Sequence, residues 1–357
     1  MIRRRAPGKL FVAGEYAVVE PGNPAILVAV DRYVTVTVTD PVEAGVEISS
    51  DLGPRGARLR WRDGRLAPHA GLTHVLSAIE TVARLLAERG LPAPEFSLLV
   101  ESGLHDNGTK YGLGSSGAVT VATLAAVAAY CRLTLSDEER FRLALLATAE
   151  LDPKGSGGDL AASTWGGWIA YRAPDRSAVR ELARDQGVEE ALRAPWPGFD
   201  VRPLPPPKEL ALEVGWTGTP ASTASLVSDL HRRPWRGTPA HQRFVRTTAD
   251  CVHAAIEALE RGDGPELTAR IRQARQELAR LDDEVALGVF TPRLTALCEA
   301  AEAVGGAAKP SGAGGGDCGI ALLDAGATRD IARLRERWAS AGIVPLPIRP
   351  AAEGNQR

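Results

Sequence analysis

The chain has 357 residues, of which 44% are hydrophobic, and its formal net charge at pH 7 is −2. This length exceeds the size at which one hydrophobic core usually stops growing, so the sequence predicts two domains. The nearly neutral charge argues against binding to nucleic acids or anionic membranes through bulk electrostatics.

Membrane spans, secretion and disulfides are not expected either. No apolar run reaches about 18 residues without a charge, so we predict no transmembrane helix. Residues 1–5 lead directly into a structured motif without the apolar core of a secretory signal. The four cysteines are scattered, with no C-x-x-C spacing, which is typical of reduced thiols in a cytoplasmic protein.

The first hundred residues predict mainly strands. Residues 6–19 contain a short apolar strand with Lys9 near its start, followed by a glycine turn. Helical periodicity runs from about residue 72 to 88 and stops at Gly90. Partial alternation and short apolar runs predict strands over residues 26–39, about 45–50, about 57–62 and 96–101.

Residues 110–121 (K-Y-G-L-G-S-S-G-A-V-T-V) predict a phosphate-binding loop. Three glycines and two serines precede a run of small apolar residues, which predicts a buried helix over about 116–130. The first N–H groups of a helix lack partners, and glycines before them let a phosphate approach. Ser115 and Ser116 add hydroxyls that can bind a phosphate oxygen or face a phosphate-bound Mg²⁺. The pattern also matches G-x-G-x-x-G, so a Rossmann loop and a plain glycine-rich turn remain alternatives.

A second glycine loop follows a helix predicted over residues 137–150. It covers residues 154–159 (K-G-S-G-G-D) and precedes a strand at 167–171. Asp159 shares this loop with Lys154, and a carboxylate beside a lysine suits acid–base or charge-positioning work. An ordinary helix cap is the alternative interpretation of Asp159.

The domain boundary is predicted within residues 173–197, which are polar and contain prolines. We therefore expect domains of residues 1–190 and 191–357. In the second domain, residues 216–225 form a hydroxyl-rich turn that enters a helix, with ordinary capping as the alternative. The remaining predicted elements are strands at 198–204, 210–216, 320–323 and 343–349, and helices at about 239–261, 264–283, 291–304 and 327–340.

A third glycine segment, residues 309–319 (K-P-S-G-A-G-G-G-D-C-G), lies between a helix and an apolar strand. Its backbone amides are placed where a ligand can approach, and the strand that follows fits poorly with a floppy linker. Four of the five lysines of the chain stand in glycine-rich segments. We interpret this as the use of a compact ammonium at phosphates.

These segments resemble three ordered motifs of the GHMP kinase superfamily, most closely of its phosphomevalonate kinase branch. Residues 6–18 resemble the first motif, residues 110–119 the second and residues 309–318 the third. Residues 216–222 (W-T-G-T-P-A-S) resemble a substrate segment of that branch. No G-x-x-x-x-G-K-[ST] occurs, so a P-loop kinase is not expected.

The resemblance implies an α/β (α+β) fold. An N-terminal domain like ribosomal protein S5 domain 2 would pair with a C-terminal ferredoxin-like domain, and the site would lie between them. It also implies transfer of a phosphoryl group from ATP, with Mg²⁺, to (R)-5-phosphomevalonate in the mevalonate route to isoprenoids. A monomer or a homodimer is expected, with no nucleic acid or membrane partner.

Residue roles are carried over from the same resemblance. The implied catalytic residues are Lys9 and Asp159. The loop that would hold ATP comprises Lys110, Gly112, Leu113, Gly114, Ser115, Ser116 and Gly117, and Ser116 would meet Mg²⁺. The implied acceptor contacts are Lys9, Tyr16, Lys110, Ser156, Ser222, Ala313 and Gly314.

Two departures from the family pattern argue against mevalonate kinase. Lys110-Tyr111 stands where many relatives begin the second motif with proline, and Tyr16 stands where mevalonate kinases carry histidine. A phosphate monoester is already ionised at neutral pH, so we expect Asp159 to position charge more than to accept a proton. Mevalonate kinase, diphosphomevalonate decarboxylase and a non-catalytic ligand-binding protein of this fold remain alternatives.

Overall fold

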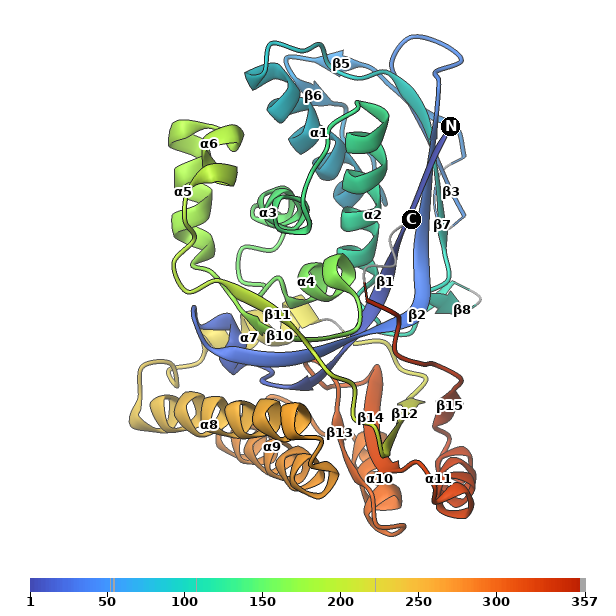
Figure 1. Cartoon of the computed structure of the whole chain (residues 1–357), viewed down its shortest axis with the longest axis vertical. Helices are drawn as coiled ribbons and strands as arrows, with labels where there is room; N and C mark the ends of the chain where they lie inside the picture. Colours follow the sequence, from blue (N-terminus) through green and yellow to red (C-terminus); the bar gives the residue numbers. More distant parts are fainter. Residues whose placement is uncertain (52, 54, 107, 222, 354–357) are drawn as a thin grey trace.

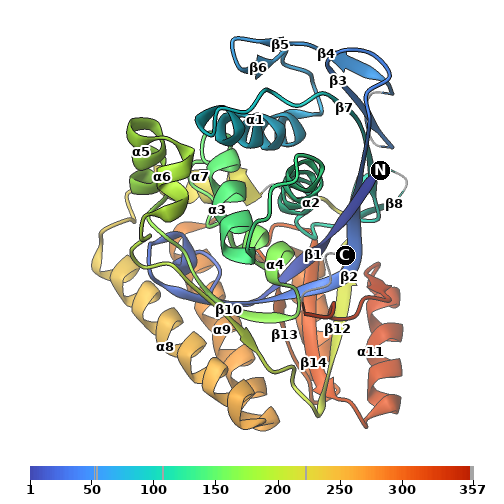
Figure 2. The same ribbon diagram turned by 45° about the horizontal axis from the view of Figure 1, so that its top comes forward.

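The computed structural model describes residues 1–51, 53, 55–106, 108–221 and 223–353. Ser222, one of the predicted acceptor contacts, therefore lies outside the described residues. The described chain forms two packed parts, each with its own β-sheet (Figures 1 and 2). No helix within these residues combines the length and apolar character needed to cross a membrane.

The larger sheet has seven strands and is built around the long strand β2, Pro24–Thr39. β2 pairs antiparallel with β1, β7 and β10, and β3 runs parallel to β7. Its buried half is apolar because it is covered on both faces. The other strands are β1 (Ile2–Ala13), β3 (Val46–Ser50), β4 (Ala57–Leu59), β7 (Phe96–Ser102), β10 (Trp168–Arg172) and β11 (Asp200–Leu204).

Four helices cover one face of this sheet (Figure 1). Most residues of the central helix α2, Ser115–Tyr130, are buried, as its run of small apolar residues predicts. Helix α3 (Asp137–Thr148) begins with a capping box in which Ser136 and Glu139 satisfy each other's backbone amides. The other two helices are α1 (Thr73–Glu88) and α4 (Gly158–Trp165), and α4 was not predicted.

The predicted boundary segment is folded rather than irregular. It contains α5 (Arg176–Gln186) and α6 (Val188–Arg193). Asp175 caps α5 through two backbone amides, and Arg142 of α3 donates to the Leu192 carbonyl at 2.9 Å. Its polar, proline-containing sequence predicted a domain boundary and no helices. It folds because a few buried apolar residues, such as Val179, dock onto the N-terminal part.

The smaller sheet has four antiparallel strands in the order β13-β14-β12-β15. The strands are β12 (Leu210–Trp216), β13 (Ala307–Pro310), β14 (Cys318–Asp324) and β15 (Val344–Leu346). Helices α10 (Pro292–Glu302) and α11 (Thr328–Ser340) pack beside it (Figure 1). This mixed arrangement agrees with the expected GHMP fold. Four two-residue strands complete the list: β5 (Trp61–Arg62), β6 (Arg65–Leu66), β8 (His105–Asp106) and β9 (Thr109–Lys110).

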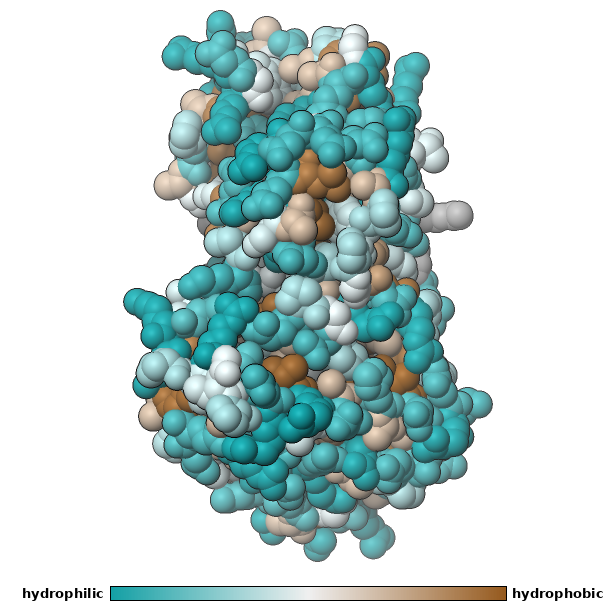
Figure 3. Space-filling model, turned by 90° about the vertical axis from the view of Figure 1, so that its left-hand side faces the viewer, coloured by the Kyte–Doolittle hydropathy of each residue, from teal (hydrophilic) through white to brown (hydrophobic). Residues whose placement is uncertain are grey.

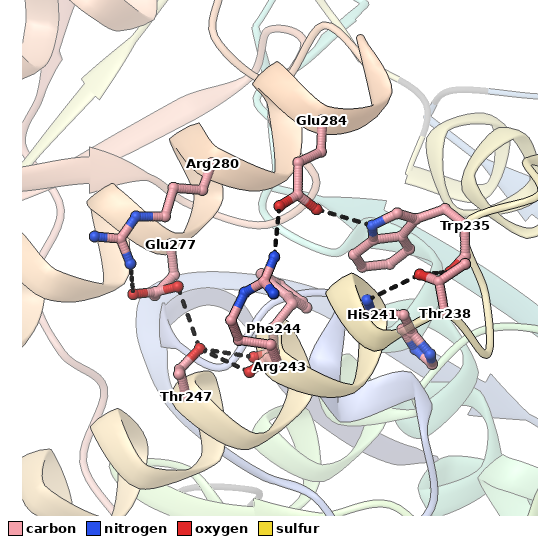
Figure 4. A network of polar contacts seen from close by, with 9 residues as sticks. All are labelled: Trp235, Thr238, His241, Arg243, Phe244, Thr247, Glu277, Arg280 and Glu284. Atoms are coloured by element: carbon pink, nitrogen blue, oxygen red, sulfur yellow. Dashed lines mark hydrogen bonds and ion pairs between the residues drawn. The ribbon is translucent and has the colours of Figure 1, made fainter.

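A pair of long helices, α8 (Pro239–Arg261) and α9 (Gly264–Val285), lies below the larger sheet (Figure 1). Helix α7 (Thr223–Arg232) precedes them. Figure 4 shows how the α7–α8 connection is tied to α9: the Trp235 indole and Arg243 both donate to the Glu284 carboxylate, at 3.0 and 3.1 Å.

The larger sheet draws on both ends of the chain. β11 pairs with β10, and near the C-terminus Ala351 donates to the Ala29 carbonyl at 2.8 Å. β11 is a strand of the larger sheet and the segment around Ala351 contacts it, although both belong to the predicted second domain, residues 191–357. The boundary after residue 190 stays a prediction. On the face drawn in Figure 3, the molecule narrows between its two parts and its surface is mostly hydrophilic.

Candidate active site

Lys9 lies on β1 at the point where the two parts of the molecule meet. Its backbone amide donates to the Leu113 carbonyl at 2.8 Å, which fixes β1 against the second glycine-rich motif. The side chain is only 8% exposed, and its ammonium lies 5.2 Å from the centre of the Phe11 ring. Among the described residues, no carboxylate lies within 4.0 Å of this ammonium. A buried cation without an anionic partner favours an anionic ligand.

The second motif forms a turn directly before α2, as predicted. Gly114 is the N-cap of the helix and has left-handed backbone angles, a conformation that glycine adopts without steric cost. Leu113 is buried, Ser115 is half-buried and Ser116 is exposed in the first helical turn. A methyl group on Gly114 would lie 3.0 Å from Lys9 Cε and 3.4 Å from Asp159 Cβ. The loop, Lys9 and Asp159 therefore share one location.

Asp159 lies in the first turn of α4. This position is compatible with the alternative interpretation of Asp159 as an ordinary helix cap. Its carboxylate, however, faces another helix: a methyl group on Gly117 would lie 2.5 Å from Asp159 Oδ2. The neighbouring Ser156 accepts a hydrogen bond from the Gly158 amide through its hydroxyl, at 3.2 Å. The Ser156 carbonyl accepts one from the Tyr171 hydroxyl, at 2.5 Å. The second glycine loop is thus held against α2.

The third motif reaches the same place from the C-terminal part. A methyl group on Gly312 would lie 3.9 Å from Lys9 Nζ. Ser311 exchanges two hydrogen bonds with the backbone of Phe11, at 2.8 and 3.0 Å. The side of Gly314 that would carry a side chain faces the C-terminal part, because a methyl group there would lie 2.5 Å from the Val289 carbonyl oxygen.

Lys309 corrects the interpretation that lysines in glycine segments serve phosphates. It is fully buried and forms an ion pair with Glu15, and it also donates to the Pro310 carbonyl at 2.7 Å. Glu15 also accepts a hydrogen bond from the Gly312 amide at 3.3 Å. The ammonium of Lys309 is therefore satisfied inside the protein and joins the first motif to the third.

Tyr16 and Ala313 form a second connection between these two motifs. The Tyr16 hydroxyl donates to the Ala313 carbonyl at 2.5 Å, and both residues are buried. Burial raises the pKa of this hydroxyl, and the charges of Asp282 and Glu15 raise it further. The hydroxyl is therefore protonated at neutral pH and acts as a donor.

Lys110 lies at the edge of the site, because it comes directly before the turn that precedes α2. Lys110 and Lys154 are exposed. Burial lowers the pKa of His74, while Asp159 opposes that change and Lys110 adds to it. His74, in the first turn of α1, is thus close enough to both residues to experience their charges.

Sequence reasoning assigned no role to Glu15, His74 or Asp317. Glu15 and Asp317 stand inside the first and third motifs, so the motifs themselves were the available signal. In the sequence, His74 looks like any polar residue in the first turn of a helix, so no signal there pointed to it. Asp317 approaches the second motif closely, since a methyl group on Gly112 would lie 2.5 Å from Asp317 Oδ2. The described residues contain no group of three or more His, Cys, Asp or Glu side chains arranged to hold a metal ion.

Comparisons with known proteins agree with this geometry. Residues 74–167 match the model of the GHMP kinases N terminal domain, and residues 255–340 match the GHMP kinases C terminal model. The chain is 69% identical to the phosphomevalonate kinase of Streptomyces sp. (strain CL190), over 99% of this chain and 98% of that protein. It is 28% identical to the mevalonate kinase of Pyrococcus abyssi, over 99% and 97% of the two chains.

Among solved structures, the chain superposes on Streptococcus pneumoniae phosphomevalonate kinase in complex with phosphomevalonate and AMPPNP. The TM-score is 0.86 and the sequence identity is 30%, over 98% of this chain and 100% of that one.

Proposed function

The chain belongs to the GHMP kinase family, and we propose that it transfers the terminal phosphoryl group of ATP to the phosphate of (R)-5-phosphomevalonate. The products are 5-diphosphomevalonate and ADP, in the mevalonate pathway of isoprenoid biosynthesis. The observation that carries this conclusion is the 69% identity to a phosphomevalonate kinase over nearly the full chain. The 28% identity to a mevalonate kinase is far lower.

The acceptor determines what the site has to do. The phosphate of a monoester has a second pKa of about 6, so its oxygen is already largely ionised at neutral pH. Transfer to such an oxygen needs no strong base. It needs cations and amide dipoles that bring two polyanions together and stabilise the charge that moves between them.

We assign the ATP phosphates to the loop of Lys110 and Gly112–Gly117 at the start of α2. The unpaired amides and positive dipole end of that helix support this role. Lys9 lies beside Gly114 and has no carboxylate partner among the described residues, which supports a contact with both the acceptor and the transferring group.

Asp159 is proposed to position charge rather than to accept a proton. Its carboxylate lies against Gly117, at the helix end assigned to the nucleotide phosphates. Mg²⁺ fits the same location, because the exposed Ser116 hydroxyl and the Asp159 carboxylate are hard oxygen donors. The ion would neutralise phosphate charge when bound, and Ser116 is the residue we propose as its protein ligand.

The acceptor is proposed to contact Lys9, Tyr16, Lys110, Ser156, Ser222, Ala313 and Gly314. For Tyr16, the hydrogen bond to the Ala313 carbonyl supports a contribution through the shape of the third motif. For Ser156, the hydrogen bond to the Gly158 amide supports a fixed orientation of its hydroxyl.

A coupled assay of ADP release tests the proposal, with mevalonate, 5-phosphomevalonate and 5-diphosphomevalonate as acceptors. Release with 5-phosphomevalonate is expected. Release with mevalonate alone would identify a mevalonate kinase, and release with loss of CO₂ from 5-diphosphomevalonate a decarboxylase. Nucleotide binding without ADP release from any acceptor would favour a non-catalytic ligand-binding protein.

We also propose a cytoplasmic location, supported by four cysteines that are all unpaired thiols. A monomer or a homodimer is proposed as the oligomeric state. Cell fractionation and light scattering test these two points.

A further inference from the structure

Asp317 lies where three separate segments meet. Its Oδ1 accepts a hydrogen bond from the Ala221 amide at 3.0 Å, and its amide donates to the Thr219 carbonyl at 2.8 Å. Its carbonyl accepts from the amide and the hydroxyl of Thr217, at 2.9 and 3.0 Å. One residue of the third motif thus fixes residues 217–221, which we call the acceptor segment because they lead directly to Ser222.

The same residue touches the nucleotide loop. The Asp317 side chain lies so close to Gly112 that a methyl group there would be 2.5 Å from Oδ2. Two neighbouring contacts reinforce this approach. The Cys318 thiol donates to the Tyr111 carbonyl at 3.0 Å, and the Tyr111 and Trp216 rings meet edge to face at 5.3 Å. Tyr111, which departs from the family pattern, therefore packs against the residue that precedes the acceptor segment.

The backbone at this position indicates that the side chain is needed. Asp317 has a φ of 53°, in the left-handed region, and it follows three glycines that also have positive φ. A fourth glycine would adopt this conformation at lower cost. A carboxylate here must therefore contribute something that glycine cannot, and its hydrogen bond to Ala221 is that contribution.

The charge of Asp317 does not explain its presence. Burial raises the pKa of its carboxyl, while the Ala221 amide, Lys9 and Lys110 lower it. A negative charge close to two lysines that would hold polyanions weakens their attraction for those ligands. The useful property of Asp317 is then an acceptor oxygen with a fixed direction.

We propose that Asp317 is a positioning residue that holds the acceptor segment against Gly112, so that binding of the nucleotide and binding of the acceptor favour each other. This inference rests on the proposed function. Because Asp317 touches Gly112 on one side and Ala221 on the other, ordering of either segment orders the second one. The entropy cost of ordering the two segments then falls on the first ligand to bind. The second ligand binds more tightly as a result, which is positive coupling.

The test compares Asp317→Ala with Asp317→Asn, because asparagine keeps an acceptor oxygen of the same reach and removes the charge. For Asp317→Ala, we expect the KM for 5-phosphomevalonate to rise about tenfold, as for the loss of one buried hydrogen bond. The kcat should stay within about threefold of wild type, and Asp317→Asn should restore the KM to within about twofold. Calorimetry with AMPPNP, with and without 5-phosphomevalonate, should give a coupling factor that Ala abolishes and Asn retains.

Three results would overturn the proposal. They are an Asn variant as impaired as the Ala variant, a fall in kcat with unchanged KM, and a coupling factor that Ala leaves intact. If Asp317→Ala does not fold, Thr217→Val removes one hydrogen bond to the Asp317 carbonyl and should shift the same KM in the same direction, by less. An unchanged KM in that variant would also contradict the proposal. Absence of ADP release by the wild-type protein would refute the proposed function instead.

Discussion

Lys9 and Lys309 look alike in the sequence but occupy opposite electrostatic situations. Each stands in a glycine-rich motif, and each is buried, with 8% and 0% of its surface exposed. The ammonium of Lys309 is paired with Glu15 and also donates to the Pro310 carbonyl. Lys9, by contrast, has no carboxylate within ion-pair distance among the described residues.

The two buried cations therefore differ in whether the fold supplies a carboxylate partner. Removing a charge from water is costly unless a partner compensates for it. Lys309 has its partner inside the fold, 294 positions away in the sequence. In the part of the chain that the structure describes, Lys9 has no such partner, as expected of a cation that binds an anionic ligand. Two substitutions test this comparison directly, and two more, with smaller expected effects, extend it to the other charged residues of the site.

Lys309→Met should reduce the free energy of unfolding by about 3–5 kcal/mol, because it leaves the Glu15 carboxylate buried without a partner. Urea denaturation followed by circular dichroism measures this change. The double variant Glu15→Gln/Lys309→Met should recover most of the loss, since it removes both charges. A single variant that loses less than about 1 kcal/mol would contradict a buried, fully desolvated pair.

Lys9→Met should lower kcat about 10²- to 10³-fold, because it removes the charge that we propose to stabilise the transferring phosphoryl group. Its thermal midpoint should stay at the wild-type value or rise, in contrast to Lys309→Met. Lys208→Met is the matched control, since Lys208 is an exposed lysine outside the glycine segments. If Lys9→Met destabilised the protein as strongly as Lys309→Met, the two lysines would have the same role.

Lys110→Ala should raise the KM for 5-phosphomevalonate about tenfold and change kcat by less than about threefold. Lys110 is exposed at the rim, where it can attract the acceptor without taking part in the transfer. Initial rates at varied acceptor concentration and saturating ATP give both constants. Because the attraction is screened by salt, the difference from wild type should shrink as ionic strength rises, and a salt-independent difference would argue for a direct, desolvated contact.

Asp159→Asn should lower kcat by less than about tenfold if Asp159 positions charge. General-base chemistry would instead cost about 10²–10⁴-fold. The acceptor oxygen is already ionised at neutral pH, so the profile of kcat against pH should keep its shape in the variant. A loss near 10⁴-fold with unchanged binding of both substrates would show that Asp159 accepts a proton.

Features with local causes could be predicted from the order of the amino acids. Glycines before an apolar run predicted a phosphate-binding loop, and periodicity with capping residues placed α1, α2 and the long helices α8 and α9. Three motifs in the right order indicated the GHMP kinase family. Each of these signals depends on residues within a few positions of one another, which is the range over which propensity, periodicity and caps act.

The pairing of groups that are far apart in the chain follows from the three-dimensional fold. It paired Lys309 with Glu15, directed the Tyr16 hydroxyl to the Ala313 carbonyl and brought Asp317 to Gly112. It also folded the polar segment after residue 173 into α5 and α6, through contacts with α3. Such pairings carry no local signature, because they depend on burial and on contacts between residues hundreds of positions apart. The same contacts decide whether a buried lysine has a carboxylate partner inside the fold or is left to bind an anionic ligand.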